Sequence, residues 1–185
     1  MIQHTKKVLL LPGFKNSGAG HWQTVWEATQ PFAPVPVTRL EHADWDEPNY
    51  ATWQGELEQH LEKERETTFL VCHSLGCLNA LSITNNSRLR GKISGALFVA
   101  PANPNRKDFP KQITGFPSPL DYEGSPPFPI TLVASRNDPY AAWEWSQSVA
   151  RHLKCRKFVD IGERGHINGD SGLGGWALGV ALVSL

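Results

Sequence analysis

The sequence has no excess of charge of either sign, since 18 Lys and Arg residues balance 18 Asp and Glu residues among 185. Proteins that bind nucleic acid or an anionic membrane surface usually carry a clear basic excess. We therefore expect neither nucleic acid nor a membrane as a partner.

Cysteine is scarce, and long hydrophobic runs are missing. The three cysteines lack the spacing of a metal site, which suits a reducing compartment. The apolar run after Lys7 stops at Pro12, too early for a signal peptide. The apolar stretch 176–185 has about half of the residues that a membrane-spanning helix needs. We expect a cytoplasmic protein without a metal.

What the sequence has instead is an alternation of strand-like and helix-like segments. Runs rich in Val, Leu, Ile and Phe predict strands at 8–11, 35–40, 68–72, 96–100, 130–135 and 158–161. Such runs are typical of parallel strands buried on both faces. Helical patterns fall at 21–29, 50–61, 75–84 and 140–153. We predict one three-layer α/β domain over residues 1–185.

One segment interrupts this rhythm. Residues 101–129 contain eight of the 14 prolines together with several large apolar side chains. A loop of this length inside a compact domain is usually a functional flap or a linker. Because the composition is similar on both sides, we expect a proline-rich flap over the functional site.

The stretch TFLVCHSLGCLNAL, residues 68–81, places Ser74 between an apolar strand and an apolar helix. This is the setting of a nucleophile elbow, whose usual signature is G-x-S-x-G. Here Gly76 supplies the second glycine, while Cys72 replaces the first. An isolated Ser-x-Gly is common by chance, so the flanking strand and helix carry the prediction. An ordinary serine in an ordinary turn is the alternative.

A nucleophilic serine needs a base, and the base needs an orienting carboxylate. Asp138 in ASRNDPY and His166 in ERGHIN both follow predicted strands, in the chain order Ser, Asp, His of α/β-hydrolases. Asp138 before Pro139 could instead be a helix N-cap, and His166 could be an ordinary loop histidine. The agreement of all three in order favours a catalytic triad.

The glycine-rich loop PGFKNSGAGHW follows the first strand. It lacks the Lys-Ser/Thr of a phosphate-binding loop, which disfavours a nucleotide. We predict that the backbone N–H groups of Phe14 and Leu75 form an oxyanion hole. Trp22 and Trp176 are candidates for lining the pocket, with core packing as the alternative.

These motifs resemble those of small, nearly capless α/β-hydrolases of the YdeN and retinoblastoma-binding-protein type. The resemblance runs from Val8 to Trp176 and is carried by LLPGFKNSGAGHWQTVWE, ADWDEPNYATW, VCHSLGC, FVAPAN, PFPITLVASRNDPY, FVDIGERGHIN and SGLGGW. It implies an all-parallel sheet in the order 2-1-3-4-5-6 and a serine-hydrolase triad of Ser74, Asp138 and His166.

The leading hypothesis is therefore a serine hydrolase of carboxylesterase type that acts on a small ester or related acyl compound through an acyl-enzyme on Ser74. It needs no cofactor. The alternative is a protein-binding or regulatory member of the fold with weak activity, although the sequence does not indicate a protein partner. Acyl transfer to an acceptor other than water is a third possibility.

Overall fold

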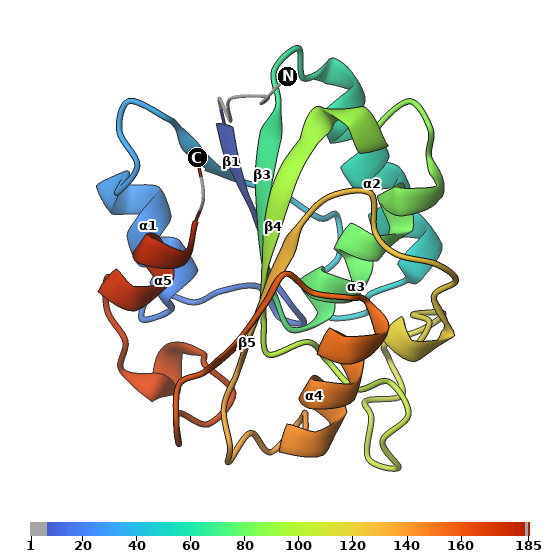
Figure 1. The fold of residues 1–185 in the computed structure, drawn as a ribbon, viewed down its shortest axis with the longest axis vertical. Coiled ribbons are helices and arrows are strands. Elements are labelled where there is room, and N and C mark those ends of the chain that lie inside the picture. The colour runs from blue at the N-terminus through green and yellow to red at the C-terminus, as the bar shows by residue number, and fades with distance from the viewer. Residues whose placement is uncertain (1–6, 184) are drawn as a thin grey trace.

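The computed structural model describes residues 7–183 and 185, and at its centre lies a parallel sheet of six strands (Figure 1). The strand order is β2-β1-β3-β4-β5-β6, and every neighbouring pair is parallel, which confirms the predicted order. The strands are β1 (Lys7–Leu11), β2 (Val37–Arg39), β3 (Thr68–His73), β4 (Ile93–Val99), β5 (Ile130–Ala134) and β6 (Lys157–Asp160).

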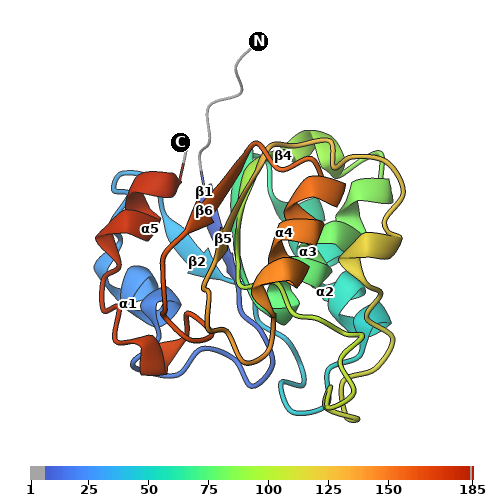
Figure 2. The same ribbon diagram turned by 60° about the horizontal axis from the view of Figure 1, so that its bottom comes forward.

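Helices cover both faces of this sheet. In both ribbon views α1 and α5 lie on one face, and α2, α3 and α4 lie on the other (Figures 1 and 2). The helices are α1 (Trp22–Thr29), α2 (Tyr50–Lys63), α3 (Leu75–Ser82), α4 (Trp143–His152) and α5 (Ala177–Leu182). No helix in the described part of the chain has the length and apolar character to cross a membrane.

Side chains along the central strands β1, β3, β4 and β5 alternate between two hydrophobic clusters. Leu9 and Leu11 of β1 pack into the cluster under α2, α3 and α4, whereas Val8 and Leu10 pack into the cluster under α1 and α5. Successive residues of a strand point to opposite faces, so a strand covered on both sides must be apolar at every position. This requirement explains the near-continuous apolar runs.

The segment 101–129 runs from the carboxyl end of β4 to the amino end of β5, and its second half lies beside α2, α3 and α4. It contains one short 3-10 helix, Pro119–Asp121. Thr114 fixes its middle to the start of α2, because its N–H donates to the oxygen of Pro48 and its oxygen accepts from the N–H of Tyr50. Phe116 packs edge-on against Trp53 of α2, with ring centroids 5.5 Å apart.

Candidate active site

The structure brings Ser74, Asp138 and His166 together at the carboxyl edge of the sheet. The Oγ atom of Ser74 lies 2.9 Å from Nε2 of His166, and Nδ1 of His166 lies 2.9 and 3.0 Å from the two carboxylate oxygens of Asp138. A carboxylate only accepts, so Nδ1 carries the proton and Nε2 accepts from the serine hydroxyl. The imidazole is thus held in the tautomer that can take a proton from Ser74.

Ser74 occupies a sharp turn between β3 and α3. Its backbone has φ 52° and ψ −115°, and its N–H donates to the oxygen of Val99 at 2.9 Å. A residue with a side chain rarely adopts this conformation, which costs about 1–3 kcal/mol. The turn places the serine directly before the amino end of α3, where the helix dipole favours negative charge.

Gly76 allows this turn to lie close to β1. A Cβ atom at this position would be 2.2 Å from the oxygen of Leu11 and 2.6 Å from that of Pro12, both backbone atoms. The position two residues before Ser74, where the usual signature has its first glycine, has room for a side chain. The side chain of Cys72 is fully buried in the cluster under α2, α3 and α4, so a cysteine fits where the usual signature has glycine.

Replacing Gly76 by alanine should lower the free energy of unfolding by about 3 kcal/mol or more, because the new methyl group overlaps fixed backbone atoms. Gly55 is a matched control, since an added Cβ there meets no atom within 4 Å and the residue lies inside α2. Gly55→Ala should raise the same free energy by about 1 kcal/mol through helix propensity. Urea unfolding measures both, and equal changes would contradict the close approach.

The predicted oxyanion donors both border the cavity beside Ser74. A Cβ at Gly13 would lie 2.9 Å from the Cβ of Ser74 and 3.3 Å from the nitrogen of Leu75, so the loop after β1 packs against the turn. Leu75 is the first residue of α3, and its N–H has no partner within the helix. In the described part of the chain, the backbone N–H of Phe14 likewise has no acceptor.

Two side chains hold the backbone beside His166. Nε2–H of His73 donates to the oxygen of His166 at 2.9 Å, and the indole N–H of Trp22 donates to the oxygen of Ile167 at 2.8 Å. His73 immediately precedes Ser74, so one turn supplies both the hydroxyl and a support for its base. No local sequence pattern indicates this role, because the contact joins residues 93 positions apart in the chain.

Two more supports come from the loop after β5. Oγ of Ser135 accepts from the N–H of Arg164 at 2.8 Å, and Oδ1 of Asn137 accepts from the N–H of Gly165 at 2.7 Å. Both residues belong to the polar run ASRNDPY that contains Asp138. That concentration of polar side chains at a strand end was the signal that could have identified them.

The predicted pocket-lining role of Trp22 and Trp176 is wrong. Their side chains are 0% and 6% exposed, and neither borders the cavity that contains Ser74. The two rings lie 4.9 Å apart and pack with Trp26 between the sheet and the helices α1 and α5. Large aromatic side chains gain more by this complete burial than by lining an open pocket, so core packing was the better interpretation.

Asp138 contacts His166 and caps a turn, but it does not have the helix N-cap role that the sequence left open. Besides His166, its Oδ1 accepts from the N–H groups of Tyr140 and Ala141 at 2.8 and 3.2 Å. The helix α4 nevertheless begins only at Trp143, so Asp138 caps a turn and not the helix itself. The side chain of Asp138 is 2% exposed, and these contacts fix its orientation.

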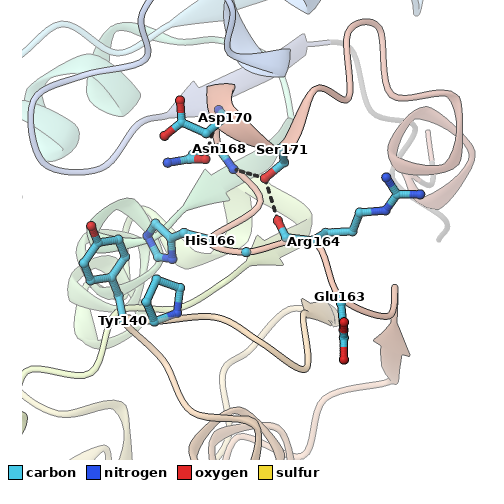
Figure 3. A pocket seen from close by; sticks show the side chains of 9 residues that line it. Tyr140, Glu163, Arg164, His166, Asn168, Asp170 and Ser171 are labelled. Carbon is cyan, nitrogen blue, oxygen red and sulfur yellow. Dashed lines mark hydrogen bonds between the residues drawn. The ribbon is translucent and has the colours of Figure 1, made fainter.

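A cavity of about 650 Å³ opens beside Ser74, and a smaller one of about 420 Å³ adjoins it at His166 (Figure 3). The proline-rich segment forms part of the wall of the larger cavity, to which it contributes Ala102, Asn103, Arg106, Phe109, Pro110 and Ile113. Within the described residues, no group of three or more His, Cys, Asp and Glu side chains could hold a metal ion.

Two buried cysteines lie close to the serine turn. The thiol of Cys77 donates to the oxygens of Cys72 and Val99. Burial raises the pKa of both the Cys72 and the Cys77 thiols, so neither is a thiolate near neutral pH. Cys77 packs beneath the turn, and Ser74 has no thiolate competitor there.

Two buried histidines flank the site. Burial lowers the pKa of His21 to about 3 and that of His73 well below its ordinary value. In the unfolded chain both titrate near pH 6.5. Below that pH the unfolded state binds more protons than the folded state. The contribution of the two histidines to the free energy of unfolding is therefore largest above about pH 6.5 and decreases as the pH falls.

Between pH 7.5 and 5.5 the free energy of unfolding should therefore decrease by about 1 kcal/mol for each of these histidines. His21→Asn removes one titrating group and keeps an acceptor for the N–H of Gln23, which Nδ1 of His21 now binds. Urea unfolding across this range should show a loss that is about 1 kcal/mol smaller in the variant. Identical profiles would contradict a neutral His21 in the folded state.

Comparisons with known proteins agree with this geometry. A family model described as serine hydrolase matches residues 8–184. The YdeN protein of Bacillus subtilis is 29% identical over 97 residues, which is 52% of this chain and about half (50%) of the length of that curated relative. Its crystal structure has a TM-score of 0.73 at 22% identity and covers 92% of both chains.

Two further structures are similar. A YdeN-like hydrolase from Pectobacterium atrosepticum has a TM-score of 0.78 and 28% identity, covering 97% of this chain and 88% of its own. Mouse alpha/beta hydrolase domain-containing protein 10 has a TM-score of 0.68 at 14% identity, covering 98% and 90%. The fold is thus that of the α/β-hydrolases.

Proposed function

This chain belongs to the serine hydrolase family, and on that premise we propose that it hydrolyses carboxylic esters through an acyl-enzyme on Ser74. The observation that carries the proposal is the unbroken hydrogen-bond chain from Ser74 through His166 to Asp138. A serine hydroxyl is a weak nucleophile, and this arrangement is the one that activates it at neutral pH.

In the proposed first step, Oγ of Ser74 attacks the ester carbonyl carbon while Nε2 of His166 takes its proton. Asp138 keeps the imidazole oriented and stabilises the imidazolium that forms. The N–H groups of Phe14 and Leu75 donate to the oxyanion of the tetrahedral intermediate, and each such donor contributes about 10²–10³ in kcat.

His166 then gives the proton to the leaving alcohol oxygen as the bond between that oxygen and the former carbonyl carbon breaks. Water enters, loses a proton to His166 and attacks the acyl group on Ser74. The second tetrahedral intermediate collapses to the carboxylic acid and the free serine. Every proton passes through Nε2 of His166, and neither a metal ion nor an organic cofactor takes part in the scheme.

A series of p-nitrophenyl esters with increasing acyl length tests this proposal. We expect turnover with a burst of p-nitrophenol of about one equivalent per enzyme where deacylation is slower than acylation. The control is Ser74→Ala, which should show neither burst nor turnover. If every ester reacts with the wild-type protein only as slowly as with this variant, the proposal fails and a binding or regulatory role becomes the better account.

A further inference from the structure

The cavity beside Ser74 has two chemically different walls. One wall carries the apolar side chains of Phe14, Phe109 and Ile113, which pack against the hydrophobic cluster under α2, α3 and α4. The other wall contains Asn168, Gly169 and Asp170. It packs toward the opposite face of the sheet, since a Cβ on Gly169 would lie 3.6 Å from the backbone of Gly20 and His21 before α1.

The chemistry of the proposed reaction decides which wall faces which part of the ester. The leaving oxygen must receive its proton from Nε2 of His166, so the alcohol lies on the His166 side. Asn168 and Asp170 follow His166 closely in the chain, and both cavities border on these three residues and Tyr140. The apolar wall is then left for the acyl chain.

The polar wall offers one donor and one acceptor. Oδ1 of Asn168 accepts from the N–H of Asp170 at 3.1 Å, which leaves the amide N–H₂ to donate. The carboxylate of Asp170 is exposed and has no ion-pair partner within residues 7–183. In Figure 3 these two side chains lie on the same side of the chain as His166 and Tyr140, while Arg164 extends away from them.

On the premise of the proposed ester hydrolysis, we infer that the substrate joins an apolar acyl chain to a small hydroxylated alcohol, whose free hydroxyl groups bind Asn168 and Asp170. A hydroxyl both donates and accepts, which matches an amide N–H beside a carboxylate. Lys15 and Arg106 border the same cavity as Asp170, so its lining has no net negative charge and favours a neutral polar leaving group over a cationic one.

The test compares two hexanoate esters whose alcohols have equal numbers of heavy atoms, the 1-glyceryl ester and the pentyl ester. Each kcat/KM is divided by the hydroxide rate constant of the same ester, which removes intrinsic reactivity. We expect the wild-type protein to prefer the glyceryl ester about tenfold, as one hydrogen bond to a charged group allows.

Asp170→Leu should lower the corrected kcat/KM of the glyceryl ester about tenfold and leave that of the pentyl ester within about twofold. Asp170→Ala replaces it if the leucine variant does not fold. Glu144→Leu is the matched control, because Glu144 is an exposed acid in the first turn of α4 that borders neither cavity. It should change neither rate.

The other possible results overturn either this inference alone or the proposed function as well. A wild-type preference for the pentyl ester, or equal rates, overturns the inference. So does a larger corrected rate for 2-aminoethyl hexanoate than for the glyceryl ester, because Asp170 would then act as an ion partner. Turnover of p-nitrophenyl hexanoate without a glyceryl preference removes this inference alone, whereas no turnover of any ester removes the proposed function with it.

Discussion

Replacing Ser74 by alanine is expected to lower kcat for an ester substrate by about 10⁵- to 10⁶-fold, the scale seen when a triad nucleophile is removed. The change deletes one oxygen atom, the one that lies 2.9 Å from Nε2 of His166. Alanine can keep the backbone conformation of φ 52° at the same strain as serine. The melting temperature should therefore change by only a few degrees.

Steady-state hydrolysis of a p-nitrophenyl ester measures this effect. The control is Ser148→Ala, which removes an exposed hydroxyl that donates to the oxygen of Glu144 in α4. The control should retain wild-type activity. A Ser74→Ala protein that keeps more than about a tenth of wild-type kcat would show that hydrolysis does not depend on this serine.

Asp138→Asn has the second largest expected effect, a decrease of about 10⁴-fold in kcat. The amide nitrogen of asparagine would donate to Nδ1 of His166, which forces the proton onto Nε2. Nε2 could then no longer accept the proton of Ser74. The remaining amide oxygen can still accept from the N–H groups of Tyr140 and Ala141, so the melting temperature should move little.

Asp44→Asn provides a close control for this substitution. Oδ1 of Asp44 accepts from the N–H groups of Asp46 and Glu47 at 2.8 and 2.9 Å, in a loop that does not border the cavity. Asp44 thus makes the same kind of backbone contacts as Asp138 without a contact to a histidine, and Asp44→Asn should keep full activity. If Asp138→Asn lost activity only in proportion to a loss of folded protein, Asp138 would be a capping residue alone.

The sequence predicted the central part of the sheet well because β1, β3, β4 and β5 are apolar at most positions. Its errors lie where that pattern is interrupted. β4 begins at Ile93, before the predicted 96, because Gly95 reads as a break although it lies inside the strand beneath the ring of Phe69. The segment Ala177–Leu182 was noticed only as an apolar stretch, and it forms α5.

The start of α4 has a different cause. The prediction began this helix at 140, since Asp138 and Pro139 form a typical N-cap pair. In the structure the carboxylate of Asp138 binds His166 and the N–H groups of the following turn, and the helix begins at Trp143. A contact between two loops far apart in the sequence decides this boundary, and no local pattern reports it.

The same limit applies to the site. Chain order and strand ends placed Ser74, Asp138 and His166 correctly, because parallel strands bring their carboxyl ends to one edge. Which side chains surround them depends on how the loops pack. Trp22 follows the loop after β1 but turns into the core, whereas Phe109 and Ile113 reach the cavity from the proline-rich segment.

The most direct test of the central claim is the position of a covalent adduct. The protein is treated with a fluorophosphonate, digested and analysed by mass spectrometry. A nucleophilic Ser74 activated by His166 predicts a single adduct on the peptide that contains residue 74, formed far more slowly in Asp138→Asn and absent in Ser74→Ala. An adduct on another residue, or no adduct on the folded wild-type protein, would contradict the account.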